Sequence, residues 1–293
     1  MQYIKYKHCP LCHSDLNLAE IIFELNENQT LLSCKKCSLI FNSCCVSDIS
    51  SIYNEDYYQS EQKDNVGGYF SYDRMEKAIL KTYRFAIRFI RNNAYSKQMS
   101  ILDVGCGYGF ILKYFRDISG FDICGVELSE KAALEAMKIT PNIIQEPIEN
   151  IKFDKSFDFI TAFELIEHLI NPVLFFEIAA KLLKDKGYLF ITTPNIASLW
   201  FTLLKKRWPG IHHNYHNVYF SPLTIKTIAN QCGFEIISIK NTNIFYINAR
   251  HVRSRLLELF PVVGNVFAIF KCIDNLDIPF LNGGDMQIIL RKI

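Results

Sequence analysis

Between Ile101 and Phe110, an apolar segment runs directly into a turn that contains three glycines. The segment before the turn has the pattern of a buried strand, residues 109–117 have that of a helix, and a second apolar segment over 122–127 ends at Glu127. In a parallel α/β sheet, such glycines let the backbone approach a ligand, and an acid at the next strand end can accept hydrogen bonds from ribose hydroxyls. The sequence therefore predicts a pocket for a nucleoside-bearing cofactor.

The glycine spacing favours S-adenosylmethionine over a dinucleotide. A dinucleotide fingerprint, G-x-G-x-x-G, would place its third glycine at Phe110, whereas the chain has glycine at Gly109 instead. Asp103 lies just before the first glycine, where it would repel a pyrophosphate but attract the cationic methionine end of S-adenosylmethionine.

This stretch resembles motif I of class I methyltransferases. The resemblance implies that the glycine turn holds the methionine end of the cofactor and that Glu127 holds the ribose. Pro147 stands where that superfamily often has an acid near the adenine, so we expect the backbone and the Ile148 side chain to contact the base. The expected cofactor-binding residues are Asp103, Gly105, Cys106, Gly107, Gly109, Glu127, Leu128, Ile148 and Phe163.

Cysteines concentrate near the N-terminus, where two C-x-x-C pairs are separated by 21 residues. This spacing predicts a zinc ribbon in which Cys9, Cys12, Cys34 and Cys37 hold one structural zinc ion, with short strands over 19–23 and 30–33. So small a module has little core and would depend on the metal to fold. Reactive thiols are the alternative.

Strands and helices alternate through the rest of the chain. An amphipathic helix is expected over 74–92. Strands are expected at 100–104, 122–127, 142–145, 157–162 and 187–193, and helices near 109–117, 129–138, 171–184 and 222–232. This alternation predicts a parallel sheet covered on both faces, and late strands at 235–239 and 285–290 fit the antiparallel hairpin that ends the methyltransferase fold.

The predicted fold class is therefore α/β: a Rossmann-like, seven-stranded methyltransferase sheet whose last strand is antiparallel, with a small N-terminal zinc ribbon. The expected divisions are a ribbon over 1–46, a linker over 47–73 and a methyltransferase domain over 74–293 with an insertion at about 248–284.

A group of polar residues follows the fourth expected strand. Glu164, Glu167 and His168 are spaced i, i+3 and i+4, so one helical turn would place them on one face, at the sheet edge where substrate lies. They could supply a general base, a cation site or both, and His168 is the expected base. The segment resembles the E-x-x-E-H segment of O-methyltransferases of ubiquinone biosynthesis, which implies Mg²⁺ at these three residues, although E-H also occurs without metal in the wider group.

Other segments carry weaker signals. Of the histidines in residues 212–216, His213 or His216 is expected on the substrate side. The aromatic and basic residues 200–208 are typical of a lid over a pocket or of contact with an amphiphile, or else of a partly buried helix. The basic-apolar residues 250–270 could rest on a membrane, bind a lipid-linked acceptor, or form a dimer surface or a cap. Oligomeric state is left open.

Charge and leader signals narrow the function classes. Lys plus Arg number 32 against 30 Asp plus Glu, for a net charge of +2, which argues against DNA and RNA partners. The first residues lack the pattern of a signal peptide, and no apolar segment is long enough to span a bilayer. Ten cysteines without a signal-peptide pattern indicate that the protein is located in a reducing cytoplasm.

The ribbon followed by the tyrosine-rich residues 52–58 is similar to methyltransferases of surface-polysaccharide and nucleotide-sugar tailoring. Some of those enzymes methylate a sugar carbon and others an oxygen, so the resemblance implies the cofactor and the fold but not the acceptor. We expect S-adenosylmethionine-dependent methylation of a small molecule, with O-methylation of a sugar, a nucleotide-sugar or a surface-glycan or lipid-linked intermediate as the favoured reaction. One alternative is an rRNA base methyltransferase, since residues 9–13 resemble the zinc-bearing start of a guanine N1-methylating group, although the acidic Glu164 and Glu167 would repel phosphates. The other is a zinc-ribbon interaction protein that binds the cofactor without catalysis, which the intact glycine motif disfavours.

Overall fold

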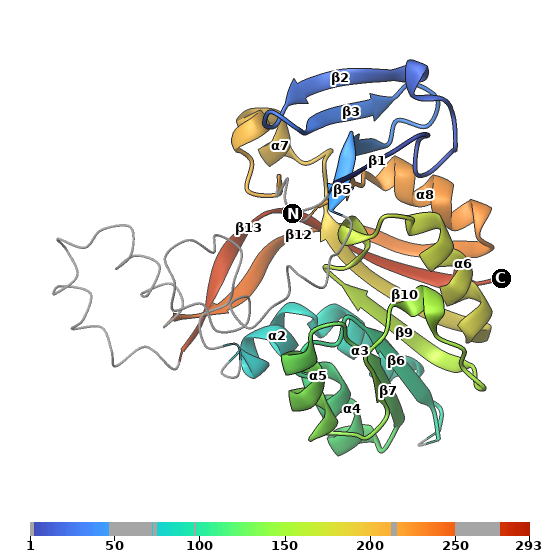
Figure 1. The fold of residues 1–293 in the computed structure, drawn as a ribbon. Helices are drawn as coiled ribbons and strands as arrows, with labels where there is room; N and C mark the ends of the chain where they lie inside the picture. Colours follow the sequence, from blue (N-terminus) through green and yellow to red (C-terminus); the bar gives the residue numbers. More distant parts are fainter. Residues whose placement is uncertain (1–2, 47–71, 73–74, 97, 212–215, 250–275) are drawn as a thin grey trace, which may run out of the picture.

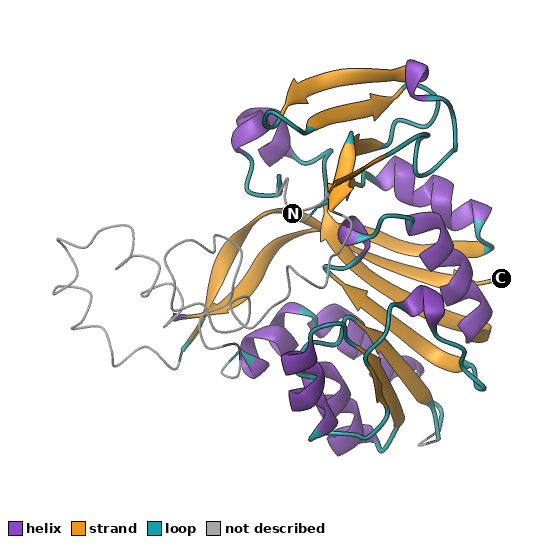
Figure 2. Cartoon of the chain, viewed as in Figure 1, coloured by secondary structure: helices purple, strands orange, loops and turns teal. Residues whose placement is uncertain are grey.

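The structure is a computed structural model that describes residues 3–46, 72, 75–96, 98–211, 216–249 and 276–293. Within these residues, a seven-stranded sheet forms the body of the molecule, and a smaller four-stranded sheet lies beside it at the top of Figure 1. Helices flank the large sheet, as the view by secondary structure shows (Figure 2). Among the described helices, none is both long and apolar enough to cross a membrane.

The large sheet has the strand order β12-β13-β10-β9-β6-β7-β8. Its strands are β6 (Ser100–Val104), β7 (Asp122–Val126), β8 (Ile143–Ile144), β9 (Phe157–Phe163), β10 (Leu183–Pro194), β12 (Phe234–Asn248) and β13 (Asp277–Lys292). Pairing is parallel from β8 through β10, and β13 runs antiparallel to both β10 and β12. The predicted methyltransferase sheet, with its last strand antiparallel, is confirmed.

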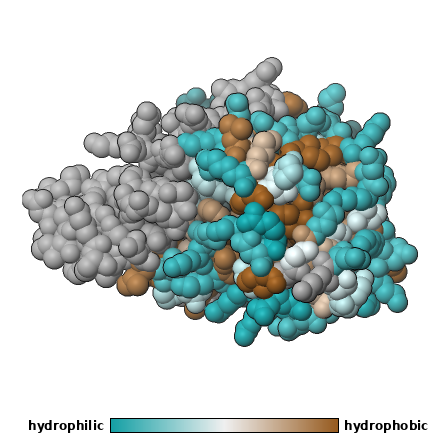
Figure 3. Space-filling view, turned by 90° about the horizontal axis from the view of Figure 1, so that it is seen from below, coloured by the Kyte–Doolittle hydropathy of each residue, from teal (hydrophilic) through white to brown (hydrophobic). Residues whose placement is uncertain are grey.

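Helices cover both faces of this sheet because side chains alternate along buried strands. Ile101 packs with α3 (Arg84–Asn93), α4 (Phe110–Ser119) and α5 (Glu130–Met137). Its neighbour Leu102 lies in the core on the other face, with α6 (Pro172–Leu182) and α8 (Pro222–Gln231). Seen from below, the described residues show hydrophilic side chains with hydrophobic ones between them (Figure 3).

The helix expected over 74–92 is divided into α2 (Glu76–Thr82) and α3 at Tyr83. The Thr82 hydroxyl donates to the Ala78 carbonyl at 2.9 Å and accepts the Tyr246 N–H at 2.9 Å. A hydroxyl that bonds to the preceding turn competes with the helical backbone pattern, and here it also fastens the helix end to β12. The break leaves Tyr83 at a corner between two helices.

The ribbon sheet draws one strand from far along the chain. The expected strands appear as β2 (Ala19–Glu24) and β3 (Thr30–Cys34), and β4 (Ile40–Asn42) is added beside β3. The fourth strand is β11 (Val218–Tyr219), which pairs antiparallel with β4. A separate pair joins β1 (Tyr3–Lys5) to β5 (Cys44–Val46), and η1 (Leu16–Leu18) precedes β2. The ribbon therefore completes its sheet with a strand from beyond residue 200.

The two parts also share a core. Leu11, Leu39 and Phe41 of the ribbon are buried in the same apolar cluster as Ile166 and Phe220. The ribbon thus has little core of its own. Apolar packing against the large domain stabilises it, in addition to any bound metal.

The last hairpin is longer than the sequence predicted. Strands were expected at 235–239 and 285–290, but β12 and β13 stay paired as far as Asn248 and Asp277. Residues 277–284, which were expected in an insertion, therefore belong to β13. The sequence does not predict this part of the strand, because the apolar alternation typical of strands is weak there. Residues 250–275 of that insertion lie outside the described residues, as does the expected linker except for Tyr72.

Candidate active site

A cavity opens at the carboxyl ends of β6, β7 and β9, where the topology of a parallel sheet places a ligand. The glycine turn contributes Gly105 and Gly107, and the end of β7 contributes Glu127 and Leu128. Further wall residues are Pro147, Ile148, Phe163, Glu164, Leu165 and His168. The cavity therefore has an end formed by the glycine turn and an end formed by the segment after β9.

The glycine turn adopts a backbone that side chains disfavour. Gly105 and Gly107 have φ of 74° and 54°, and Gly109, with φ of 75°, precedes the first residue of α4. A Cβ on Gly107 would lie 2.8 Å from the Tyr72 hydroxyl oxygen. The conformation at position 107 therefore favours glycine, and any side chain there would displace the Tyr72 hydroxyl.

Glu127 is buried at the cavity wall and is fixed by two backbone donors. Its Oε2 accepts the Gly107 N–H at 2.8 Å, and its Oε1 accepts the Ser129 N–H at 2.8 Å. Each carboxylate oxygen still has acceptor capacity for a ligand hydroxyl. Burial raises the pKa of Glu127, although the two backbone hydrogen bonds oppose this shift. Ser129 also caps α5, since its hydroxyl accepts the Ala132 N–H.

Three of the expected cofactor residues do not line the cavity. Asp103 is 4% exposed and accepts a 2.6 Å hydrogen bond from the Thr161 hydroxyl. Burial raises the pKa of Asp103 to about 7, and the nearby Glu127 charge adds to the rise. The Cys106 side chain packs in the core against Gly125, and Gly109 serves as the helix cap. These residues support the turn from beneath.

Two tyrosines at the cavity were missed from the sequence. Tyr83 stacks on Phe163 with ring centroids 4.1 Å apart, and Tyr72 packs on Tyr108 and Phe110 at 4.8 and 5.6 Å. Tyr83 lies within the helix expected over 74–92, and Tyr72 lies within the expected linker. Residue spacing could not predict that Tyr83 faces the cavity, because this depends on the break between α2 and α3.

The polar residues after β9 are not arranged on a single helical turn. Glu164 has φ of 49°, and its N–H donates to the Thr192 carbonyl, while only Ile166–His168 form the short helix η4. Glu164 and His168 line the cavity, whereas Glu167 is 1% exposed and lies behind it. The prediction that Glu164, Glu167 and His168 share one helical face is wrong, because the Glu164 backbone is hydrogen-bonded to β10 and does not enter the helix.

Glu167 lies next to His168. Its Oε1 is 3.8 Å from His168 Nε2, and its Oε2 accepts a 2.9 Å hydrogen bond from the Thr193 hydroxyl. Burial raises the pKa of both Glu167 and Glu164, and the negative charge of Asp285 raises each further. The site therefore favours a bound proton or a nearby cation.

His216 joins this group from a distant segment. Its ring centroid is 4.8 Å from that of His168, and its Nδ1 is 3.0 Å from the Gly210 carbonyl oxygen. Potential ligand atoms of Glu167, His168 and His216 lie within 4.8 Å of one another, a group that does not include Glu164. His213 lies outside the described residues.

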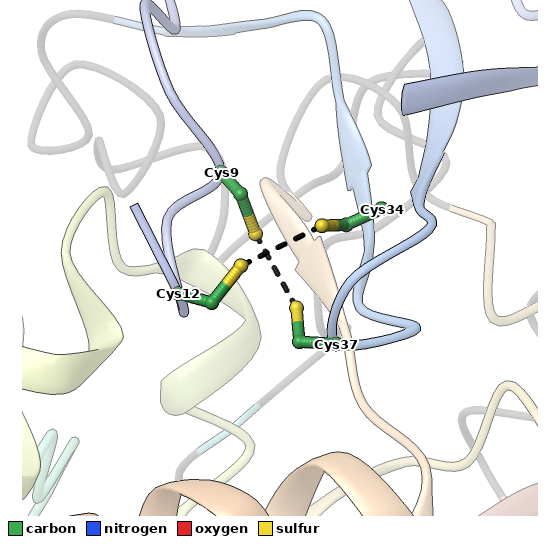
Figure 4. Close-up of side chains that lie close together, drawn as sticks. All are labelled: Cys9, Cys12, Cys34 and Cys37. Atoms are coloured by element: carbon green, nitrogen blue, oxygen red, sulfur yellow. Dashed lines mark hydrogen bonds between the residues drawn. The ribbon is translucent and has the colours of Figure 1, made fainter. Parts of the chain in front are cut away.

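The four ribbon cysteines point toward one another from two loops (Figure 4). The Sγ atoms of Cys9 and Cys37 are 3.5 Å apart, and those of Cys12 and Cys34 are 3.6 Å apart. Tetrahedral zinc with bonds of about 2.3 Å would place its sulfurs about 3.8 Å apart. All four cysteines are free thiols, so their geometry fits the predicted zinc ribbon.

Comparison with known families gives a match to the methyltransferase domain family over residues 75–239, which is more than half of the chain. This segment begins beside α2 and ends within β12, so it contains the glycine turn, Glu127 and the polar residues after β9. The ribbon lies outside it.

Curated relatives include ubiquinone biosynthesis O-methyltransferases. The protein from Hydrogenovibrio crunogenus is 28% identical over 175 residues, which are 53% of this chain and 70% of the relative. That from Thiobacillus denitrificans is 24% identical, over 51% of this chain and 70% of the relative. The match to the Dictyostelium discoideum mitochondrial protein, 29% identical, spans 33% of this chain and only 36% of the relative.

Solved structures share the fold. The magnesium protoporphyrin IX methyltransferase of Synechocystis PCC 6803, with bound S-adenosylmethionine, aligns with a TM-score of 0.52 at 11% identity, over 85% of this chain and 99% of that one. A S-adenosylmethionine-dependent methyltransferase from Archaeoglobus fulgidus aligns with a TM-score of 0.50 at 19% identity, over 74% and 94% of the two chains. At such identities the likeness concerns the fold.

Proposed function

Because this chain belongs to the methyltransferase domain family, we propose that its cavity binds S-adenosylmethionine beside a hydroxyl-bearing small molecule and catalyses O-methylation. The chain is an S-adenosylmethionine-dependent methyltransferase in fold and family. We therefore propose which acceptor the chain methylates and which residues bind the cofactor and the acceptor.

The observation that carries the proposal is the Glu127 carboxylate, held at the cavity wall between the N–H groups of Gly107 and Ser129. A carboxylate in this position can accept hydrogen bonds from the two ribose hydroxyls, while the glycine turn leaves room for the methionine end. Leu128 and Ile148 offer apolar contacts to the adenine from the same wall. Asp103 adds negative charge beneath the turn when it is ionised.

The acceptor lies, in this proposal, at the other end of the cavity near Glu164 and His168. The sulfonium of S-adenosylmethionine supplies an activated methyl group, so the protein mainly has to orient the acceptor and remove its proton. His168 takes the proton of the acceptor hydroxyl. Glu167, whose Oε1 lies 3.8 Å from His168 Nε2, stabilises the imidazolium that results.

Two metal ions belong to the proposal. Zinc at Cys9, Cys12, Cys34 and Cys37 would have a structural role. Mg²⁺ at Glu164, Glu167 and His168 is the alternative to His168 as the base, because a protonated imidazole cannot bind a cation. There it would offset the carboxylate charges and polarise the acceptor hydroxyl, and His216, which the structure brings next to Glu167 and His168, is a further ligand candidate. In support, burial and the charge of Asp285 raise the pKa of both Glu164 and Glu167, so a cation beside these two carboxylates would be favoured.

Sugars, nucleotide-sugars and surface-glycan or lipid-linked intermediates are the proposed acceptors. The named relatives are O-methyltransferases, and the polar groups at the acceptor end suit a hydroxyl nucleophile. One observation favours a lipid-linked acceptor and peripheral membrane contact. On α7 (Leu199–Leu204), Leu199 and Leu203 are 71% and 65% exposed next to the basic η5 (Lys205–Arg207).

The first experiment is calorimetric titration of the zinc-loaded protein with S-adenosylmethionine and S-adenosylhomocysteine, followed by methyl transfer to the proposed acceptors with and without Mg²⁺. We expect micromolar binding of both cofactor forms and turnover on a hydroxyl acceptor. Absence of binding would contradict the cofactor assignment, and a salt-sensitive RNA affinity would favour an RNA base as the substrate instead.

The role of His168 is tested by His168→Ala. We expect turnover to fall about 100- to 10,000-fold because a general base is lost, while S-adenosylmethionine binding stays unchanged since the cofactor end is untouched. His8→Ala, which removes an exposed histidine of the ribbon, is the control. Normal turnover of the His168 variant would remove this residue from the proposed mechanism.

A further inference from the structure

The four ribbon cysteines are connected to the start of β4 by a tight turn. The Ser38 N–H donates to the Cys34 carbonyl at 2.8 Å, and the Cys34 N–H donates to the Leu39 carbonyl at 2.9 Å. Strand β4 begins at Ile40, three residues after Cys37. The conformation of the cysteine cluster therefore sets where β4 begins and how it is oriented.

Strand β4 in turn holds the segment that carries His216. Phe41 pairs with Val218, and Ile40 pairs with Tyr219. Asn42, at the end of β4, extends this contact with two hydrogen bonds. Its backbone N–H donates to the Asn217 carbonyl at 2.9 Å, and its side-chain Nδ2 donates to the His216 carbonyl at 2.6 Å.

Asn217 passes the contact on to the acceptor end of the cavity. Its backbone N–H donates to the Glu167 carbonyl at 2.8 Å, and its side-chain Nδ2 donates to the His168 carbonyl at 2.6 Å. Asn42 and Asn217 are both buried, with 0% and 4% exposure. A continuous series of buried hydrogen bonds thus leads from the ribbon to the backbone of Glu167 and His168.

Apolar packing alone would hold the ribbon against its neighbour without fixing its position. Phe41, Ile166, Val218 and Phe220 lie in one core cluster, and such contacts are non-directional. A buried amide is different, because displacement would leave its partner carbonyl without a hydrogen bond at a cost of about 1–3 kcal/mol. The two asparagines therefore select one position of residues 216–217 relative to His168.

We propose that the ribbon is a structural part of the acceptor site and that Asn42 is a positioning residue, which acts on His168 and His216 through the His216 and Asn217 carbonyls. This inference rests on the proposed function for its catalytic consequence. The juxtaposition that carries it is a ribbon strand paired with β11 directly beside the two histidine rings.

The test compares two matched variants of the full zinc-loaded chain. Asn42→Asp removes the Nδ2 donor at nearly constant size, and Gln29→Glu makes the same amide-to-acid change at a ribbon residue that is 1% exposed and lies in the turn before β3. For Asn42→Asp we expect kcat to fall about 10- to 100-fold, as for a small misplacement of a reacting group. Zinc content and S-adenosylmethionine affinity should stay within twofold of the parent protein.

A second readout needs no acceptor. The imidazole NMR signals of His168 and His216, assigned by single His→Gln variants, should shift in Asn42→Asp and stay in place in Gln29→Glu. If Asn42→Asp does not fold, Asn42→Ser removes the amide without adding a charge and is held to the same expectations.

Unchanged kcat and unchanged imidazole signals in the Asn42 variants would overturn the inference, and so would equal losses in Gln29→Glu. Failure of the parent protein to bind S-adenosylmethionine or to methylate any acceptor would instead contradict the proposed function. In that case the imidazole signals still decide whether Asn42 positions the histidines.

Discussion

The two ends of the cavity are built in different ways. At the cofactor end, Glu127 is fixed by the N–H groups of Gly107 and Ser129, which are 20 and 2 residues away along the chain. At the acceptor end, the His168 and His216 carbonyls are held by partners 49 and 174 residues away. The first end is formed by consecutive elements, from β6 through α4 and β7 to the start of α5, whereas the second exists only when the ribbon, β11 and η4 come together.

The largest effect that would test this contrast is expected for Gly107→Leu. A leucine at this positive φ is strained, it would displace the Tyr72 hydroxyl 2.8 Å from the new Cβ, and its side chain would occupy the cavity, so S-adenosylmethionine binding should fall below detection in calorimetry. The zinc content should not change, because the ribbon lies outside the local unit. Gly120→Leu is the matched control, since Gly120 also has a positive φ but nothing lies within 4 Å of its added Cβ. Normal cofactor affinity in Gly107→Leu would contradict the local description of this end.

The next largest effect is expected for Cys34→Ser in the ribbon, which adjoins the acceptor end of the cavity. Loss of one ligand should release zinc, and because the ribbon shares its core with α6 and α8, the melting temperature of the whole chain should fall by about 10 °C. Metal analysis and calorimetric melting measure these outcomes. Cys44→Ser, at a buried cysteine outside the cluster, should retain the zinc. A ribbon that lost its zinc without any change in melting of the rest would show that the two parts are not coupled.

The smallest effect concerns Asp103 beneath the cofactor turn. Burial raises the pKa of Asp103 from 3.8 to about 7, so between these values the folded chain retains a proton that the unfolded chain has released. The free energy of unfolding should therefore fall as pH rises through this window. Glu127, Glu164 and Glu167 contribute with the same sign, so the comparison must be made between variants.

In Asp103→Asn, the contribution of this one carboxyl disappears, and the decrease in melting temperature between pH 4.5 and 7.5 should be smaller by roughly 5 °C. The cofactor-free protein is used for the scans. Asp117→Asn, the same change at a half-exposed aspartate on α4 that is paired with Arg116, is the matched control. Identical slopes in all three proteins would mean that Asp103 titrates as an ordinary surface carboxyl.

The sequence predicted most of the large sheet because its signals are local. Apolar runs and flanking turns located the strands from β6 to β10, and a glycine motif marked the cofactor end. Element boundaries were less well determined: β10 begins at Leu183 instead of residue 187, and the helix before β6 breaks at Tyr83. The break depends on the Thr82 hydroxyl and its bond to Tyr246, a contact with a strand 164 residues away.

Within the site, residue type alone could not show which side chains face the cavity. Asp103 and Cys106 lie in the same motif as Gly105 and Gly107, yet their side chains are buried beneath the turn. Glu164 was expected on the helical face of Glu167 and His168, but its backbone bonds to β10 and takes a left-handed conformation. The orientation of Asp103 follows from the alternation of side chains along β6, and that of Glu164 from its hydrogen bond to β10.

The sequence by itself determined the cysteine spacing, the glycine turn, the acid that follows β7 and the alternation that produces the sheet, because each depends on residues close together in the chain. Only the tertiary structure decided that β11 completes the ribbon sheet and that Asn42 and Asn217 connect the ribbon to His168. The two residues of β11 are too few to show a strand pattern, and a hydrogen bond across 174 residues leaves no periodicity in the sequence. Such contacts arise from the packing of whole elements, which fixes positions that local preferences leave open.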